Sequence, residues 1–189
     1  MNNLISLKKI SKSFSINRKI PVLKNINYSF KAGKVYSLMG PSGSGKSTLL
    51  NILSMIDKPT NGSLLFNNNK INFSQTVTND KIRSKKIGII YQQNNLLPDF
   101  TALENVYLAG LALSDDKKNS MEKAKKIIKK MGLSSREHHY PSELSGGEMQ
   151  RIAIARALIN EPEIILADEP TGSLDQSKAK EVFQILYNL

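Results

Sequence analysis

The chain has 189 residues, 40% of them hydrophobic, which predicts one domain with a core of its own. It contains no cysteine, which excludes a disulfide framework and a thiolate metal site, and no apolar run approaches the roughly 18 residues of a membrane span. The N-terminal residues lack the apolar stretch of a signal peptide, so we expect a cytoplasmic location. A net charge of +11 permits attraction to nucleic acid or to an anionic membrane surface, but it defines a site for neither.

The first predicted elements are strands at Leu4–Ile10 and Val22–Phe30, where apolar residues partly alternate with Asn and Ser. Phe14 lies between them, and by itself it is interpreted as a core or loop aromatic. A turn at Lys31–Lys34 leads to a third predicted strand at Val35–Met39, an apolar and β-prone run.

The next segment, Gly40–Ser47, fits the Gly-x-x-x-x-Gly-Lys-[Ser/Thr] phosphate-binding pattern at every fixed position. Its glycines let the backbone curl so that N–H groups converge on an anion, and a helix predicted from about Lys46 adds the positive end of its dipole. Lys46 is expected to reach the β and γ phosphates, and the Ser47 hydroxyl to ligate Mg²⁺. An ordinary Gly/Ser turn is the alternative, which the flanking strand and helix disfavour. We therefore expect ATP and Mg²⁺ to be bound by Gly40, Pro41, Ser42, Gly43, Ser44, Gly45, Lys46, Ser47 and Thr48.

A hairpin is predicted from Ser63–Phe66 and Lys70–Phe73, followed by the polar segment Thr76–Lys86, which can include a short helix. Ile87–Tyr91 is a compact β-branched run that predicts a buried strand. It ends at Gln92. Because a parallel sheet presents side chains to its ligand at the strand ends, Gln92 is a candidate site residue.

Two helices are predicted next, at Thr101–Leu113 and Ser120–Met131. In the second, apolar residues recur at helical spacing while the lysines face elsewhere. We interpret the lysines as a solvated face, with attraction to a membrane surface as the alternative. His138 and His139 are interpreted as surface-loop residues.

A second glycine-rich motif, Leu144–Glu148, precedes an alanine-rich predicted helix. Ser145 and Glu148 have the spacing of a capping box, so a well-capped helix start would explain both residues. The two glycines exceed what a cap needs. A serine and two bare backbone units at a helix N-terminus can bind an anion, so we predict a second phosphate-binding helix start at Ser145, Gly146 and Gly147.

The last predicted strand, Glu163–Ala167, delivers two adjacent carboxylates, Asp168 and Glu169. Neighbouring residues on a strand point to opposite sides, so the two acids cannot play the same part. Asp168 is expected to hold Mg²⁺, directly or through water, and Glu169 to polarise an attacking water. A simple strand-end turn is the alternative, which the preceding phosphate loop disfavours.

Together these motifs resemble the nucleotide-binding subunits of ABC transporters over essentially the whole chain. Leu144–Glu148 (LSGGE) is similar to the signature that separates this family from other P-loop ATPases. The resemblance implies that Gln92 senses the γ-phosphate site, ligates Mg²⁺ and contacts a transmembrane partner. It also implies that Ser173-Leu174-Asp175 is the D-loop and that Phe14 stacks on adenine.

The resemblance implies an α/β fold: a P-loop NTPase with a RecA-like parallel-sheet core, an N-terminal antiparallel β subdomain and an inserted α-helical subdomain. We expect a single domain, with the sheet parts at about 1–92 and 160–189 and the helical subdomain at about 93–159. The family has a switch histidine on a further strand, and the chain stops at Leu189, before that position. We therefore expect that the C-terminal part is missing, through truncation, fragmentation or an incomplete reading frame.

A narrower resemblance is carried by Tyr91-Gln92, Leu96–Val106 and Tyr140–Leu144, which are similar to ATPases of lipoprotein-releasing, macrolide-export and cell-division systems. The run LLPDFTALENV reads like the lipoprotein-release type. The implied function is an ATP-hydrolysing transporter subunit, peripheral on the cytoplasmic face of the inner membrane and bound to integral-membrane subunits. The catalytic residues would be Glu169, Lys46 and Gln92, the metal ligands Ser47, Gln92 and Asp168. In the implied homodimer, Ser145, Gly146 and Gly147 of one copy complete the ATP site of the other.

Two other classes of function remain open at this stage. A soluble ABC ATPase acting on DNA or ribosomes fits the basic charge, but the chain lacks the coiled-coil insertion or second cassette usual there, so no nucleic acid partner is expected. A catalytically idle or regulatory nucleotide-binding protein gains weight from the absent switch histidine. Steady-state ATPase turnover distinguishes this last class. A simple P-loop kinase leaves the LSGGE motif unexplained.

Overall fold

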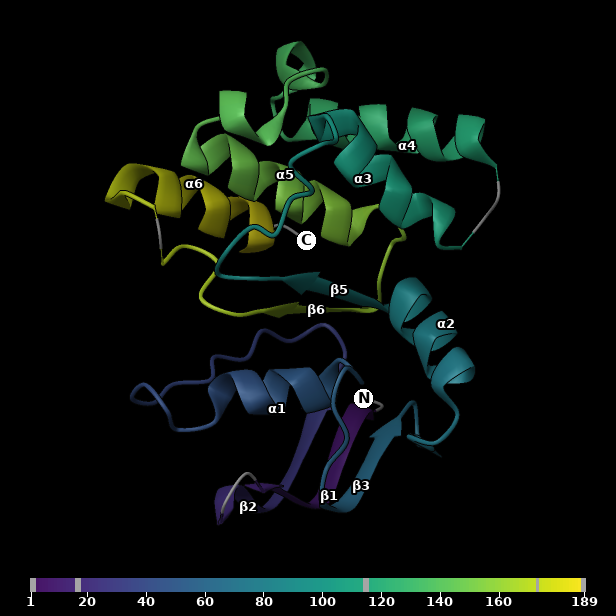
Figure 1. The fold of residues 1–189 in the computed structure, drawn as a ribbon, viewed down its shortest axis with the longest axis vertical. Helices are drawn as coiled ribbons and strands as arrows, with labels where there is room; N and C mark the ends of the chain where they lie inside the picture. The colour runs from purple at the N-terminus through teal and green to yellow at the C-terminus, as the bar shows by residue number, and fades with distance from the viewer. Residues whose placement is uncertain (1–2, 16–17, 114–115, 173, 188–189) are drawn as a thin grey trace. The chain divides into compact units, whose positions relative to one another are not determined.

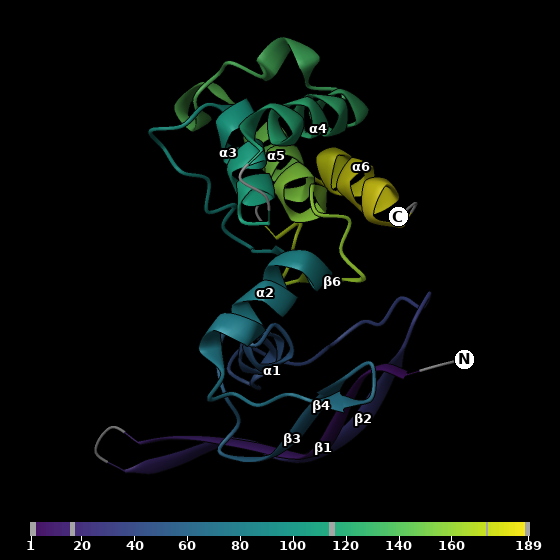
Figure 2. The same cartoon turned by 90° about the vertical axis from the view of Figure 1, so that its right-hand side faces the viewer.

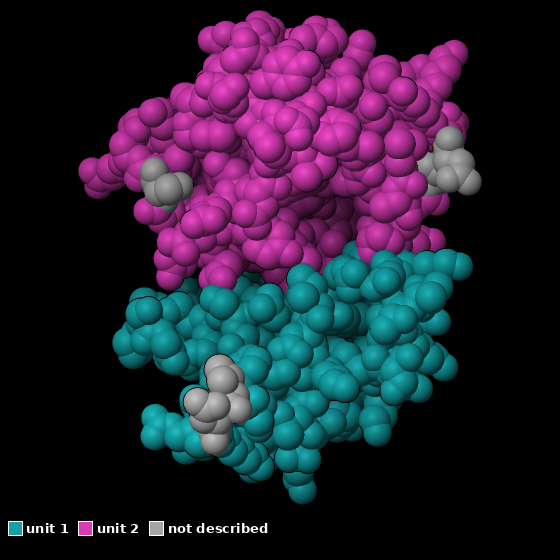
Figure 3. Space-filling model, in the orientation of Figure 1, with its two compact units in different colours: residues 1–83 teal, residues 84–189 magenta. Residues whose placement is uncertain are grey.

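The structure is a computed structural model that describes residues 3–15, 18–113, 116–172 and 174–187. The chain divides into two compact units, residues 1–83 and residues 84–189, which are coloured separately in Figure 3. The first unit contains the antiparallel strands and the phosphate loop. The second unit contains most of the helices and a parallel strand pair.

An antiparallel sheet forms the body of the first unit (Figure 2). Among the described residues its strand order is β2-β1-β3-β4, with β1 at Asn3–Ser15, β2 at Lys19–Lys31, β3 at Asn61–Phe66 and β4 at Asn69–Lys70. The predicted strands at 4–10 and 22–30 are thus confirmed. The predicted hairpin also forms, but β4 ends at Lys70 rather than at Phe73. Asn67 and Asn68 both have positive φ, as a two-residue hairpin turn requires.

Helix α1 (Lys46–Leu53) packs against the sheet through β2. Its buried residues are Leu49, Ile52 and Leu53. They meet a sheet face on which alternate apolar residues are fully or almost fully buried, among them Ile5, Leu7, Ile10, Leu23 and Leu64. Burying each such side chain contributes about 1.5–3 kcal/mol, so this contact holds the start of α1, and the loop before it, to the sheet.

The segment Val35–Met39 is not a strand, contrary to its apolar pattern. Val35 is 80% exposed and Met39 is 86% exposed. Tyr36 packs edge-on against aromatic rings of β2 and anchors the segment there. The prediction was wrong because a β-prone run favours only an extended chain, whereas a strand also needs a neighbour for its backbone hydrogen bonds. None of the described strands pairs with these residues.

Two parallel strands belong to the second unit. Helix α2 (Thr76–Lys86) leads into β5 (Ile87–Ile90), which pairs in parallel with β6 (Ile164–Ala167). The polar segment therefore does form a helix, and both predicted strands are confirmed, each one residue shorter than predicted. The pairing places the carboxyl ends of β5 and β6 side by side, because Ile90 is in register with Ala167.

Helices cover this strand pair (Figure 1). They are α3 (Ala102–Leu111), α4 (Lys117–Lys130), α5 (Gly146–Leu158) and α6 (Gln176–Tyr187), with short 3₁₀ turns at Ser134–Arg136 and Pro141–Glu143. Helix α5 is central, since it contacts α3, α4, α6 and β5. In α4, Ala124 and Ile128 are buried while the lysines are largely exposed, as the helical spacing of the apolar residues predicts. No helix in the described part of the chain is long and apolar enough to cross a bilayer.

Candidate nucleotide-binding site

The phosphate-binding segment forms an exposed loop that opens α1, as its sequence predicts. Lys46 folds back over this loop, and its ammonium group donates hydrogen bonds to the carbonyl oxygens of Gly40 at 2.9 Å and Pro41 at 3.2 Å. The Ser44 N–H also donates to the Pro41 carbonyl, at 3.3 Å. The loop backbone therefore wraps around the Lys46 side chain, and the ammonium group of Lys46 lies inside the loop.

Gly45 shows why the last glycine of the motif cannot be replaced. Its φ is 94°, and a Cβ at this position would lie 2.9 Å from Leu23 Cδ2 and 3.0 Å from Val22 Cγ1. Gly45 is also the N-cap of α1, so no side chain caps the first N–H groups, and no acidic residue stands in the first turn. These donors are left for an anionic ligand, and a polyphosphate fits them.

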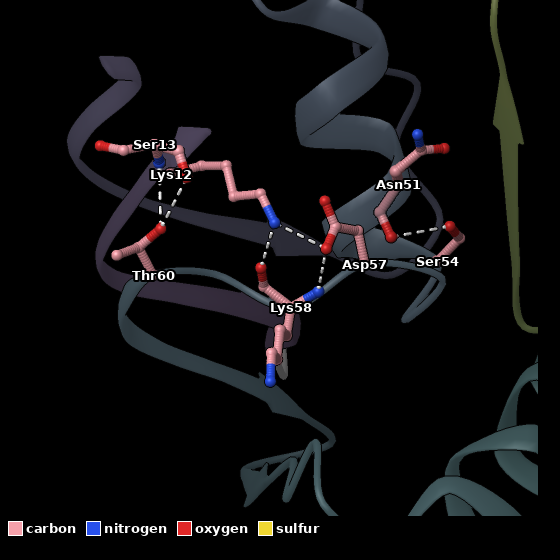
Figure 4. Close-up of polar contacts among 7 residues, drawn as sticks. All are labelled: Lys12, Ser13, Asn51, Ser54, Asp57, Lys58 and Thr60. Atoms are coloured by element: carbon pink, nitrogen blue, oxygen red, sulfur yellow. Dashed lines mark hydrogen bonds and ion pairs between the residues drawn. The ribbon is translucent and has the colours of Figure 1, made fainter. Parts of the chain in front are cut away.

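Phe14 lies near the end of β1 in the same unit, with 41% of its surface exposed. The ammonium group of Lys12 is 4.9 Å from its ring centroid, within the range of a cation–π contact. Lys12 is itself buried and donates hydrogen bonds to Asp57 Oδ1 at 2.6 Å and to the Lys58 carbonyl at 2.9 Å (Figure 4). An exposed ring on a strand end fixed in this way can stack on a base.

The two carboxylates predicted from sequence follow β6 directly. The Asp168 N–H donates to the Ile90 carbonyl at 2.9 Å, so the hydrogen-bond ladder continues one residue past the strand. Glu169 leaves the ladder with a φ of 45°, in the left-handed region. Such a conformation costs a non-glycine residue about 1–2 kcal/mol. Strain of this kind gathers at functional sites, where the surrounding structure holds it in place.

Gln92 and Glu169 approach each other around Gly172. A Cβ on Gly172 would lie 3.3 Å from Gln92 Nε2 and 3.5 Å from Glu169 Oε2. The Gly172 N–H donates to the Glu169 carbonyl at 3.0 Å, which closes the turn after β6. The parallel pairing of β5 and β6 thus brings together an amide and a carboxylate that are far apart in the sequence, and both side chains are exposed.

The LSGGE motif forms the start of α5 through a capping box. The Ser145 hydroxyl accepts the Glu148 N–H at 3.3 Å, and the Glu148 carboxylate accepts the Ser145 N–H at 2.8 Å. The Ser145 N–H foremost, and then the Ser145 hydroxyl, lower the pKa of the Glu148 carboxyl by hydrogen bonding to it, and Arg136 adds to the effect from 3.1 Å. Since the serine caps the helix, Gly146 and Gly147 supply the first helical N–H donors.

Gly147 also has a packing role that the sequence does not reveal. A Cβ at this position would lie 2.9 Å from the Lys178 Cδ of α6. A Cβ on Gly146 would be 3.9 Å from Leu174 Cδ2, so the predicted D-loop lies beside the LSGGE motif. Ser173 of that D-loop lies outside the described residues.

The predicted site residues therefore fall into two groups. The first unit holds Phe14 and the contiguous residues 40–48, and the second holds Gln92, Asp168 and Glu169 at the strand ends and Ser145–Gly147 at the start of α5. Within the described residues, no cluster of three or more His, Asp or Glu side chains could hold a metal. Mg²⁺ accepts hydroxyl, amide and carboxylate oxygens, so Ser47 in the first unit, and Gln92 and Asp168 in the second, each offer a suitable ligand atom.

Sequence reasoning missed two side chains that shape the segment after Gln92. Arg156 of α5 donates to the carbonyls of Asn94 and Asn95, and Asn105 of α3 donates to three carbonyls of residues 97–101. One signal could have found Arg156, since it shares a helix face with the buried Ile152 and Ile159. A charged residue on a buried face needs a partner elsewhere in the fold.

The model of the ABC transporter family matches residues 23–172, and the chain belongs to that family. It is an ATP-binding cassette ATPase with the fold of a P-loop NTPase, and it binds ATP. Among curated relatives, the lipoprotein-releasing system ATP-binding protein LolD of Rickettsia bellii (strain RML369-C) is 48% identical over 185 residues, covering 97% of this chain and 81% of the relative. LolD of Rickettsia felis (strain ATCC VR-1525 / URRWXCal2) is also 48% identical, with the same coverage.

Solved structures agree with this assignment. A dimeric post-hydrolysis state of the ATP-binding cassette MJ0796, bound to ADP and Pi, superposes with a TM-score of 0.89 and 43% identity. That match covers 96% of this chain and 81% of the other. CbiO1 from Clostridium perfringens, part of the cbiONQ ABC transporter complex, gives a TM-score of 0.84 at 27% identity, covering 98% of this chain and 73% of the other. The predicted family and fold class are therefore confirmed.

Proposed function

We propose that this chain is the ATP-hydrolysing subunit of a membrane complex that releases lipoproteins from the inner membrane. The observation that carries the cargo assignment is the 48% identity to lipoprotein-releasing ATP-binding proteins across 97% of the chain. The chemistry of the site supports the ATPase part independently, through the curled phosphate loop and the strained carboxylate after β6.

In this proposal the first unit binds the nucleotide. The backbone N–H groups of residues 40–47 hold the phosphates, and Lys46, already positioned by Gly40 and Pro41, shifts its hydrogen bonds to the terminal phosphates. Phe14 stacks on the adenine ring. Ser47, Gln92 and Asp168 would contribute ligands to Mg²⁺ together with the nucleotide, and the ion would neutralise charge on the phosphates.

Glu169 is the general base in this proposal. Its exposed carboxylate accepts a proton from the attacking water, and the neighbouring Gln92 amide orients that water and the γ-phosphate. Positioned general bases of this kind contribute about 10²–10⁴-fold to a rate. Lys46 stabilises the charge that develops on the phosphoryl oxygens.

A second copy of the chain completes the site. Ser145 and Gly146 are exposed at the N-terminus of α5, where a helix offers N–H donors and a positive dipole end. These groups contribute to the ATP site of the partner copy rather than to their own. The dimeric state of the related cassette solved with ADP and Pi supports this arrangement.

The segment after Gln92 is the surface that we assign to the membrane subunits. Leu97 and Phe100 are 46% and 38% exposed, and the buried Asn105 holds their loop through its side-chain amide. Exposed apolar side chains on a fixed loop are suited to docking a partner. The protein then acts as a peripheral subunit on the cytoplasmic face of the inner membrane.

The test is reconstitution of the complete protein, in liposomes loaded with a lipoprotein, with the membrane subunits that co-purify with it. We expect ATP to release the lipoprotein, and Glu169→Gln to stop release and turnover while it accumulates an ATP-bound dimer in size-exclusion chromatography. Lys46→Ala is the matched control, which should remain monomeric with ATP. Release of another cargo class instead would refute the cargo assignment alone, whereas a monomeric Glu169→Gln protein would refute the shared site.

A further inference from the structure

The guanidinium group of Arg156 joins the last turn of α5 to the segment that follows Gln92. Its Nη2 donates to the Asn94 carbonyl at 2.7 Å and its Nη1 to the Asn95 carbonyl at 2.6 Å. Asn95 has a φ of 48°, and with this local reversal of the chain both consecutive carbonyls reach the same guanidinium. One planar side chain therefore fixes two successive peptide units.

The surroundings of Arg156 show that these two bonds are its main polar contacts. Arg156 is half-buried on the packed face of α5, and this burial lowers the pKa of its guanidinium group. Among the described residues, no carboxylate lies within ion-pair distance of it. A half-buried charge without an anionic partner among the described residues depends in part on its carbonyl acceptors, and hydrogen bonds from a charged donor are stronger than those between neutral groups.

The backbone held in this way lies only two residues beyond Gln92. After Gln92, the chain is held by the bonds from Arg156 to Asn94 and Asn95. Before Gln92, the chain is held by the pairing of β5 with β6. Gln92 Nε2 in turn lies near Glu169 Oε2 beside Gly172. A catalytic amide must be held to a fraction of an ångström, and the residues that hold its backbone control that distance.

We propose that Arg156 is a positioning residue that sets where the Gln92 side chain lies with respect to Glu169. It does so from α5, the helix that Ser145 caps, and its role requires no contact with nucleotide or metal. The inference rests on the proposed role of Gln92 at the metal and γ-phosphate. A guanidinium that serves only to stabilise the fold would have no influence on that role.

The test compares three variants of the complete protein. Arg156→Met keeps the length of the side chain and removes both donors, and Arg156→Lys keeps a charge that can donate but not through a planar fork. Arg151→Met is the matched control, because Arg151 is also on α5 but donates to Glu181, at 3.0 Å. The ¹⁵N-relaxation order parameters of the backbone at residues 92–96, the Mg²⁺ concentration for half-maximal ATPase, and ATP affinity are measured for each.

We expect the order parameters of residues 92–96 to fall from about 0.85, typical of a rigid backbone, to below about 0.6 in Arg156→Met, because the variant loses both hydrogen bonds to the Asn94 and Asn95 carbonyls. The half-saturating Mg²⁺ concentration should rise and kcat fall with little change in ATP affinity. Arg156→Lys should recover part of both effects, and Arg151→Met should match the wild type.

Equal order parameters at residues 92–96 and equal Mg²⁺ dependence in Arg156→Met and Arg151→Met would overturn the proposal, even if both variants lose thermal stability. If Arg156→Met does not fold, Arg156→Lys decides by the same two measurements. If the wild type shows no ATP turnover, the proposed function fails instead. The order parameters of residues 92–96 still decide whether Arg156 holds this segment.

Discussion

Lys12 and Asp57 form an ion pair in which Lys12 Nζ lies 2.6 Å from Asp57 Oδ1, and the lysine side chain is only 10% exposed (Figure 4). The same ammonium group donates to the Lys58 carbonyl and lies over the Phe14 ring. This one buried charge therefore links the end of β1 to the chain after α1. Its carboxylate partner neutralises it.

Asp57→Ala should destabilise the protein by about 1–3 kcal/mol, because it leaves a buried ammonium group with only a carbonyl acceptor. Asp80→Ala is the matched control, since the Asp80 carboxylate that pairs with Arg83 is 59% exposed, and its loss should cost less than about 1 kcal/mol. Urea denaturation of both variants measures the difference. Equal losses of unfolding free energy in the two variants would show that the burial of Lys12 does not strengthen its ion pair with Asp57.

Lys46→Ala should abolish ATP binding, because it removes both the cation for the terminal phosphates and the hydrogen bonds that curl the loop. Lys58→Ala removes one positive charge from an exposed side chain of the same unit and should leave ATP affinity near the wild-type value. Equilibrium binding of a fluorescent ATP analogue compares the variants. Wild-type affinity in Lys46→Ala would refute the assignment of the phosphate loop.

Glu148 should make the stability of the protein depend on pH. Its hydrogen bonds from Ser145 lower the pKa of the folded-state carboxyl below its ordinary value of 4.5. The stabilisation is therefore complete above the unfolded-state pKa and is lost as the pH falls through the lower folded-state pKa. The difference in unfolding free energy between wild type and Glu148→Gln should be largest above about pH 5 and shrink below pH 4.5.

Urea denaturation between pH 3 and pH 7 gives this difference directly. A Ser145→Ala background supplies the control, because without the serine hydroxyl the pKa of Glu148 is shifted less and the pH dependence should be weaker. A difference that stays constant over this range would contradict the capping-box explanation.

Asn105→Ala should cost about 2–4 kcal/mol of stability. Its buried amide accepts the Leu97 N–H at 2.7 Å and donates to the carbonyls of Leu97, Phe100 and Thr101 at 2.9–3.1 Å. Asn119→Ala, at an exposed position of α4, should change stability by less than about 0.5 kcal/mol. Chemical denaturation tests both, and the amides of residues 97–101 should lose exchange protection only in Asn105→Ala.

Short sequence patterns correctly predicted those features whose residues are neighbours in the sequence. The phosphate loop is recognisable because backbone N–H groups, a lysine and a hydroxyl must all come from one short segment. The capping box of Ser145 and Glu148 is equally local, and the structure has both of its hydrogen bonds. The strand ends at Gln92 and Asp168 were predictable for the same reason, since each follows a short apolar run.

Long-range partners were not predictable from these patterns. Val35–Met39 has the composition of a strand, but nothing in five residues specifies a neighbouring chain. The carbonyls that Arg156 binds are more than fifty positions away in the sequence, and Gly147 meets Lys178 from another helix. Such contacts depend on how helices pack, which periodicity alone does not determine.

Because Glu169 has a left-handed backbone, stability and catalysis favour different residues at this position. Glycine adopts a φ of 45° without a Cβ penalty, so Glu169→Gly relieves strain of about 1–2 kcal/mol and removes the carboxylate at the same time. A mutant library screened only for resistance to heat would therefore enrich glycine at this position, and the selected variants would lose ATP hydrolysis. Engineering this ATPase for heat resistance requires that codon to be kept constant while stabilising changes are sought elsewhere.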